Sequence, residues 1–325
     1  MIDKIDKWGQ LIPDNLIECF NENELPVIFI GSGFGKEAVP PLKTSGELTA
    51  ELRSELDVSD GGEGLAELLQ YLQNKSVGAK RNVVAWLKRH LLHGMSKPGG
   101  AHRLLLELPC REFLTTNYDS VLIQASREIR DYTLTAIDDA GSYESYVAGA
   151  RSRDNEAVLA RLHGAFECED KIVATTDDYI HSFTDEKKWS DIVRTILRNR
   201  TVVFIGYSLR DFTTWTSYIS IFSKWKGNMP PHVMVAPLSS PHVSKFWDGY
   251  GIQYVPLKAS QFLIALHDRL GTLERDEQIA LAAAAACLSK TYDATVSEIQ
   301  QRQQEFGYSN LLMAALRIVE DSDDI

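Results

Sequence analysis

The feature that most constrains the fold of this chain is a series of short, almost uninterrupted apolar runs rich in β-branched residues. Such runs suit strands that are buried on both faces, as they are in parallel sheets. Stretches of helix length separate most of the runs, and this alternation predicts an α/β fold with a Rossmann-like, doubly wound parallel sheet. The runs comprise residues 25–31, 112–115, 158–164, 201–208, 232–237 and 252–257.

Two further regions have the pattern of helices. The segment from Thr44 to Leu108 is mostly helical in pattern and too long for a single crossover, so we expect a helical insertion at about residues 57–110. From about residue 273 the chain becomes Ala-rich, with amphipathic stretches and an acidic end. We therefore expect one domain over residues 1–272 and C-terminal helices over 273–325, which either close the core or form an oligomer or partner surface.

Charge and hydropathy exclude several classes of protein. The 325 residues include 34 Lys and Arg against 45 Asp and Glu, a formal net charge of −11, and no basic cluster of the kind that binds nucleic acid. No apolar run approaches the roughly 20 residues that a bilayer span needs. The first residues, MIDKIDKWGQLIPDN, lack the apolar core of a signal peptide. We expect a soluble cytoplasmic protein that contacts neither nucleic acid nor membrane directly.

The cysteines do not form a metal-binding or disulfide pattern. Cys19, Cys110, Cys168 and Cys287 are widely scattered, and no C-x-x-C pair occurs. Cys168 follows His163 within one segment, but the spacing does not match that of zinc ligands. We expect ordinary buried thiols and no bound metal.

A glycine-rich turn follows the first apolar run, in the sequence IGSGFGK. Gly31, Ser32 and Gly33 let the backbone turn sharply and approach a pyrophosphate, which backbone N–H groups then bind. The spacing differs from the dinucleotide pattern G-x-G-x-x-G, because Gly35 comes one residue early. Taken alone, the turn fits a structural role as well as a binding role.

Polar residues follow three more of the expected strands. In an open α/β sheet, ligands bind beyond the carboxyl ends of the strands. Each of these groups has an ordinary alternative, since Asn, Asp and Ser also cap helices and a lone His is often structural. Four such strand ends in one order are more specific than any one of them. The candidates are Thr116, Asn117 and Asp119 in TTNYD, His163 in RLHG, and Gly206 and Ser208 in IGYS.

This series resembles the sirtuin family, and more closely the bacterial sirtuin-like branch of anti-phage defence effectors, over about residues 20–270. The resemblance implies that Gly31, Ser32 and Gly33 stand where sirtuins bind the pyrophosphate of NAD. It also implies that residues 1–272 form a sirtuin-like NAD-binding catalytic domain. The catalytic residues that it implies are Asn117, His163 and Asp119, and the additional NAD-binding residues are Thr116, Gly206 and Ser208.

Two departures from the family bear on activity. Sirtuin deacylases carry a four-cysteine zinc module after the catalytic His, whereas this chain has AFECEDKIVATTDDY, so no zinc is expected. The Pro-Asp-Phe-Arg run after the glycine turn is also missing, with Pro40-Pro41-Leu42 nearby. The resemblance therefore implies an NAD⁺ hydrolase that yields ADP-ribose and nicotinamide and depletes NAD in abortive infection. A sirtuin-type deacylase and a non-catalytic subunit that binds NAD or ADP-ribose are the alternatives.

The resemblance also implies roles and a form of control. Asn117 holds the ribose and the attacking water, His163 takes a proton, and Asp119 orients either His163 or the nicotinamide pocket. Because unregulated NAD hydrolysis kills the host, we expect a homo-oligomer and a partner protein in trans, for which a HerA-like ATPase is a candidate.

Overall fold

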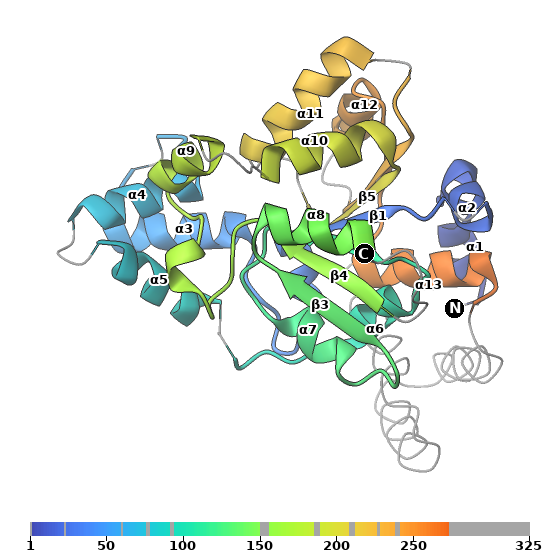
Figure 1. Cartoon of the computed structure of the whole chain (residues 1–325), viewed down its shortest axis with the longest axis horizontal. Helices are drawn as coiled ribbons and strands as arrows, with labels where there is room; N and C mark the ends of the chain where they lie inside the picture. The colour runs from blue at the N-terminus through green and yellow to red at the C-terminus, as the bar shows by residue number, and fades with distance from the viewer. Residues whose placement is uncertain are drawn as a thin grey trace.

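The core of the protein is one parallel sheet (Figure 1). The computed structural model describes residues 2–22, 24–59, 61–75, 79–91, 94–149, 156–184, 189–207, 212–225, 228–237 and 241–272. Within them, the strand order is β3-β4-β2-β1-β5-β6-β7, and every pair of neighbours is parallel. The strands are β1 (Val27–Ile30), β2 (Glu112–Thr115), β3 (Thr133–Ile137), β4 (Glu156–Arg161), β5 (Val202–Ile205), β6 (His232–Val235) and β7 (Ile252–Val255).

Five of the six predicted runs contain one of these strands and the run at 158–164 overlaps β4, so the predicted α/β fold is confirmed. Strand β3 was not predicted. It lies at the edge of the sheet and pairs with β4, and Thr133 is exposed while the residues at 134–136 are half-buried. An edge strand of this kind has no continuous apolar run, which is why its sequence, TLTAI, gave no signal.

Alternate residues of the central strand enter different cores. In β1, Ile28 and Ile30 belong to one apolar cluster, whereas Val27 and Phe29 belong to another. Both faces of the sheet are therefore covered, which explains why the strands read as continuous apolar runs.

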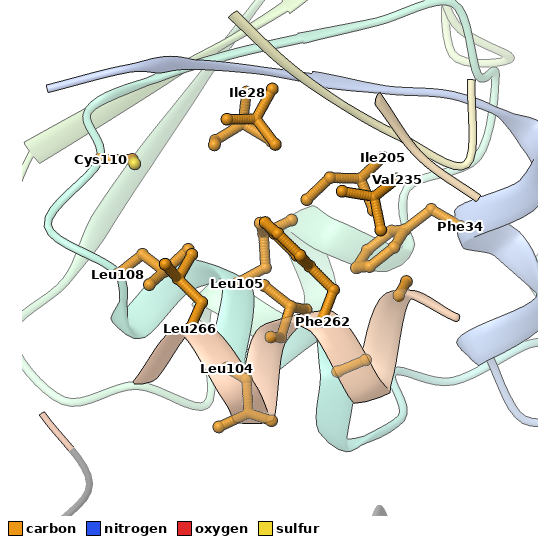
Figure 2. Packing of buried hydrophobic residues seen from close by; sticks show 14 of the residues in the cluster. Ile28, Phe34, Leu104, Leu105, Leu108, Cys110, Ile205, Val235, Phe262 and Leu266 are labelled. Atoms are coloured by element: carbon orange, nitrogen blue, oxygen red, sulfur yellow. The ribbon is translucent and has the colours of Figure 1, made fainter. Parts of the chain in front are cut away.

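The first cluster is covered by α1 (Ile2–Gly9), α2 (Asp14–Asn21), α6 (Gly100–Glu107), α7 (Val121–Ser126) and α13 (Ala259–Leu270). Figure 2 shows side chains of α6 and α13, among them Leu105 and Phe262, gathered below Ile28 and Ile205. The second cluster is covered by α8 (Ala140–Gly149), α10 (Trp189–Asn199), α11 (Phe212–Trp225) and α12 (Pro241–Asp248). Helices on both faces make the sheet doubly wound.

Three helices form a separate layer beside the sheet, α3 (Ser45–Leu56), α4 (Leu65–Lys75) and α5 (Ala79–His90) (Figure 1). Their own apolar core contains Leu48, Leu52, Leu68, Leu69, Val83, Val84, Trp86, Leu87 and Leu91. Phe166, Ile172 and Ala174, from the chain after β4, complete this core. Helix α9 (Thr176–Thr184) packs against α4.

Helix α6 lies inside the predicted insertion of residues 57–110 but packs on the sheet, with Leu104 and Leu105 in the first cluster. The boundaries of that insertion and of the domain over 1–272 stay predictions, and residues 273–325 lie outside the described part. Among the described helices, none combines the length and the apolarity that a membrane crossing requires.

Candidate active site

The register of the sheet brings the predicted strand ends to one edge. Ile30 of β1 lies opposite Thr115 of β2 and Ile205 of β5, and Thr115 lies opposite Arg161 of β4. Strands in a parallel sheet point the same way, so the chain leaves these four strands at the same edge. The residues that follow the strands are Gly31, Thr116, Leu162 and Gly206.

The turns after β1 and β5 pack backbone against backbone. The N–H of Gly33 donates a hydrogen bond to the carbonyl oxygen of Gly206 at 2.8 Å. Gly206 has a φ of 61°, and a Cβ on it would lie 2.3 Å from the nitrogen of Phe34. A Cβ on Gly31 would lie 2.5 Å from the oxygen of Gly206. The glycines are thus required by the close approach of the two turns, at the point where connections leave the sheet in opposite directions.

The TTNYD segment is tied to the first glycine turn. Thr115 donates its hydroxyl to the carbonyl of Ile30 at 3.0 Å and accepts the N–H of Asn117 at 3.0 Å. The side-chain Nδ2 of Asn117 donates to the carbonyl of Gly31 at 3.0 Å. Asn117 is therefore not a helix cap. Asp119 lies one residue before the N-cap of α7, Ser120, and its Oδ1 accepts the N–H of Val121 at 3.1 Å.

Asp119 is an acid in an unusual environment. Burial raises the pKa of its carboxyl above the ordinary range, and the hydrogen bond from the Val121 N–H opposes this only in part. A carboxyl with a raised pKa in a cavity is a frequent property of functional sites.

His163 follows β4 and is buried, with 7% of its surface exposed. The ring of Tyr179 meets the imidazole edge to face, with centroids 5.2 Å apart and an interplanar angle of 89°. Gly164 has a φ of 73°, and a Cβ on it would lie 2.5 Å from the oxygen of Lys171, so the chain doubles back after His163. The returning chain donates the N–H of Val173 to the carbonyl of His163 at 3.0 Å.

These strand ends open into one cavity of about 1010 Å³. Its volume lies at the upper end of the range for small-molecule sites. The predicted residues that line it are Ser32, Thr116, Asn117, Asp119, His163 and Gly206. Gly31 and Gly33 lie in the turn that carries Ser32, and Ser208 lies outside the described residues. The structure therefore places Asn117 and His163 in the lining of one cavity. That both side chains face the same ribose stays a prediction.

Comparisons with known proteins show what the chain is similar to. A family model described as a SIR2-like domain matches residues 111–255, a range that contains Asn117, His163 and Gly206. Residues 111–255 are therefore similar to a SIR2-like domain, and the chain resembles bacterial sirtuin-like proteins. The match begins after the glycine turn at residues 31–33. We include this turn in the candidate site because of its hydrogen bonds with Gly206 and Asn117, and not because of the family model.

Curated relatives of this sirtuin-like chain are named as NAD(+) hydrolases and, in one case, as a defense-associated sirtuin. It is 26% identical over 216 residues to the NAD(+) hydrolase ThsA of Acinetobacter baumannii (strain 532279), covering 62% of this chain and 40% of the relative. It is 25% identical over 150 residues to the NAD(+) hydrolase ThsA of Enterococcus faecium, covering 45% and 30%. It is 31% identical over 114 residues to defense-associated sirtuin 2 of Bacillus subtilis, covering 34% and 10%. The matches thus span less than half the length of each of these relatives.

Solved structures of Sir2 proteins are also similar to this sirtuin-like chain. One, described as the structural basis for the mechanism and regulation of Sir2 enzymes, covers 80% of this chain and 99% of its own, at 12% identity and a TM-score of 0.41. A second, a Sir2 homologue in complex with 2'-O-acetyl ADP ribose, covers 80% and 97%, at 15% identity and a TM-score of 0.42.

Part of the cavity wall in this sirtuin-like chain was missed by the sequence analysis. These residues come from α3, α4, α9 and the loops beside them, and they include Lys43, Arg53, Glu63, Glu67, Tyr179 and Ile180. Lys43 is paired with Glu51 at 2.6 Å, and Arg53 donates to the carbonyl of Glu63 at 2.7 Å. The sequence carries no motif for them, because they reach the cavity only through the packing of the helical layer.

The described residues also bear on metal binding. Among them, no three His, Cys, Asp or Glu side chains gather as metal ligands would, and Cys287 lies outside them. The expectation that this sirtuin-like chain binds no zinc stays a prediction.

Proposed function

We propose that this chain is an NAD⁺ hydrolase that cleaves the bond between nicotinamide and ribose, and that it acts in the bacterial cytoplasm as an anti-phage effector by depleting NAD. The observation that carries the proposal is that Asn117 and His163 line one large cavity beside the turn at Ser32. Relatives named NAD(+) hydrolase support the same substrate.

Cleavage of this bond does not require a strong general acid. Nicotinamide leaves as a neutral ring from a cationic precursor, so the site must chiefly orient the ribose and stabilise the positive charge that develops on it. Because Nδ2 of Asn117 donates to Gly31, we assign its carbonyl oxygen Oδ1 to a ribose hydroxyl or to the attacking water. Water adds to the ribose carbon as the bond to nicotinamide breaks, and ADP-ribose forms.

His163 has the second role in this proposal. We assign its imidazole to accept the proton that the attacking water loses, and to pass it on to solvent. Asp119 is assigned to orient either His163 or the nicotinamide pocket, since it lines the same cavity.

The test is chromatography of NAD⁺ incubated with the pure chain and with its Asn117→Ala and His163→Ala variants. Loss of a positioned catalytic group costs on the order of 10²–10⁴ in rate, so each variant should be nearly inactive. Asn199→Ala is the matched control, because Asn199 donates to Thr195 on the exposed side of α10. If both site variants consume NAD⁺ at the rate of the parent, the assignment is wrong.

The same assay distinguishes the alternatives and tests for control. Transfer of an acetyl group from an acetylated peptide to ADP-ribose would indicate a deacylase, and binding without turnover would indicate a non-catalytic subunit. We also propose that the chain forms a homo-oligomer and acts with a partner in trans, such as a HerA-like ATPase. Size measurements with and without the protein encoded beside it test both, and a strict monomer in all conditions contradicts them.

A further inference from the structure

A four-residue segment connects the catalytic strand end to the helical layer. We call residues 172–175, between η2 (Glu169–Lys171) and α9, the strap. The N–H of Val173 donates to the carbonyl of His163 at 3.0 Å, and the carbonyl of Val173 accepts the hydroxyl of Tyr118 at 2.7 Å. The strap is therefore hydrogen-bonded to two of the sequence motifs that line the cavity, TTNYD and RLHG.

Lys80 of α5 holds the strap from the other side. Its ammonium donates to the carbonyl of Ile172 at 2.5 Å and pairs with the carboxylate of Asp178. The same carboxylate oxygen accepts the N–H groups of Ala174 and Thr175 at 2.9 and 2.8 Å. One lysine and one aspartate thus fix three of the four residues of the strap.

The carboxylate of Asp178 is favoured in the folded chain. Burial alone would raise the pKa of Asp178, but the bond to Lys80 and the N–H groups of Thr175 and Ala174 outweigh it and lower the pKa. The side chains of Lys80 and Asp178 are 29% and 20% exposed, so salt screens their attraction less than that of a surface pair.

The pair also sets the start of α9. The N–H of Asp178 donates to the hydroxyl of Thr175 at 3.3 Å, which completes a reciprocal cap with the bond in the other direction. Tyr179 is the next residue, and its ring meets His163 edge to face. Any shift of the cap therefore moves a side chain that contacts the imidazole.

Two further sets of contacts fix α9 and the strap to the helical layer. Gln70 of α4 and Asp177 exchange two hydrogen bonds, each of 2.9 Å. The side chains of Phe166, Ile172 and Ala174 are buried in the core that α3, α4 and α5 share. The loop after His163 thus packs with the helical layer, although it follows strand β4 of the sheet in the chain.

We propose that Lys80 is a positioning residue that acts through the strap to hold the His163 imidazole and Tyr118 in the cavity. The helical layer is then a working part of the active site, although Lys80 does not line the cavity. The kinetic part of this inference rests on the proposed NAD⁺ hydrolysis. Since a displacement of about 1 Å can cost on the order of 10²-fold in rate, loss of Lys80 should lower kcat more than it changes KM.

The test observes the imidazole directly. The chain is labelled at histidine Cε1 with ¹³C, and the signal of His163 is assigned by its loss in His163→Gln. Spectra and kinetics are then compared for the parent, Lys80→Ala, Lys80→Arg and Lys88→Ala. Lys88 is the matched control, because it lies on the same helix and pairs at 2.6 Å with Glu169, which lies outside the strap.

We expect the His163 signal to shift or broaden in Lys80→Ala, to return toward its parent position in Lys80→Arg, and to stay unchanged in Lys88→Ala. Asp178→Asn keeps an acceptor oxygen for the strap but removes the charge, and it should shift the same signal. This variant replaces Lys80→Ala in the test if Lys80→Ala does not fold. A His163 signal unchanged in the folded Lys80 or Asp178 variants overturns the inference. A shifted signal in a chain whose parent never cleaves NAD⁺ supports the positioning role and overturns the proposed function instead.

Discussion

The side-chain nitrogen of Asn117 lies 3.0 Å from the carbonyl oxygen of Gly31 and donates a hydrogen bond to it. This bond joins the ends of β2 and β1, which are 86 positions apart in the chain. Two motifs that are separate in the sequence are therefore one unit in space. The bond also fixes which atom of the amide is the acceptor, because Nδ2 is engaged with the turn.

This bond predicts the effect of Asn117→Asp. A carboxylate cannot donate a hydrogen bond, and its negative charge would face the Gly31 carbonyl oxygen. We expect NAD⁺ affinity to fall about tenfold, which corresponds to about 1.4 kcal/mol, and turnover to fall by on the order of 10². Calorimetric titration and chromatography measure the two effects. Asn199→Asp on α10 serves as the control, and parent-like binding by Asn117→Asp would show that the amide orientation does not matter.

The contact between the two glycine turns predicts the effect of Gly206→Ala. An L residue at a φ of 61° is strained, and the new Cβ would lie 2.3 Å from the nitrogen of Phe34. We expect the free energy of unfolding to fall by roughly 2 kcal/mol or more, measured by denaturant titration. Gly149→Ala, at the end of α8, is the control, since its Cβ meets no described atom within 4 Å. Equal losses in the two variants would mean that the close approach is not rigid.

The sheet could be predicted from the sequence because its strands are buried on both faces. Val27, Ile28 and Phe29 are all apolar for this reason, and their pattern is visible without knowledge of the partners. Strand β3 is different. Its exposed Thr133 and single neighbour leave no such pattern, so its existence follows from pairing with β4 rather than from its own residues.

Only those residues of the candidate site that follow strands of the sheet could be predicted from the sequence. Asn117 and His163 come directly after strands, and parallel strands carry such residues to one edge. The opposite wall, which includes Arg53 and Tyr179, lies on helices whose place is set by contacts between distant segments. The bond from Lys80 to the carbonyl of Ile172 spans 92 positions and has no local signature.

The environment of Asp119 predicts that removing its charge raises the stability of the fold but lowers NAD⁺ turnover. Its pKa is raised in the folded chain, so the stability it contributes at low pH is lost as pH rises through that pKa. Asp119→Asn is neutral at every pH, and its Oδ1 still accepts the N–H of Val121. We therefore expect a higher melting temperature than that of the parent at neutral pH, and a loss of NAD⁺ turnover of at least about tenfold.

Calorimetry checks the predicted melting temperature of Asp119→Asn, and the pH profile of turnover checks the predicted loss of activity. If the carboxylate form is the active one, the parent should lose activity on the acid side at a pH above the ordinary range for Asp, and the residual activity of Asp119→Asn should lack that loss. A variant that is less stable than the parent at neutral pH would instead assign Asp119 a purely structural role.

The buried imidazole of His232 predicts an acid-sensitive fold. Burial lowers its pKa from 6.5 to about 4, and its Nδ1 accepts the N–H of Val202 at 3.2 Å between neighbouring strands. Below pH 6.5 His232 is protonated in the unfolded chain, whereas in the folded chain it is protonated only below about pH 4. The free energy of unfolding should therefore fall with decreasing pH across this window, by up to about 1.4 kcal/mol per pH unit from this residue.

Denaturant titrations of the parent and His232→Gln across that range measure this effect. The difference between the two free energies of unfolding should change with pH, because the variant lacks the titrating group but keeps a side chain that can accept a hydrogen bond. His267 adds a loss of the same sign, since burial also lowers its pKa, so His267→Gln should remove a separate part of the slope. A pH-independent difference between the parent and His232→Gln would show that the imidazole is accessible to protons in the folded chain, and that the sheet is not closed around β6.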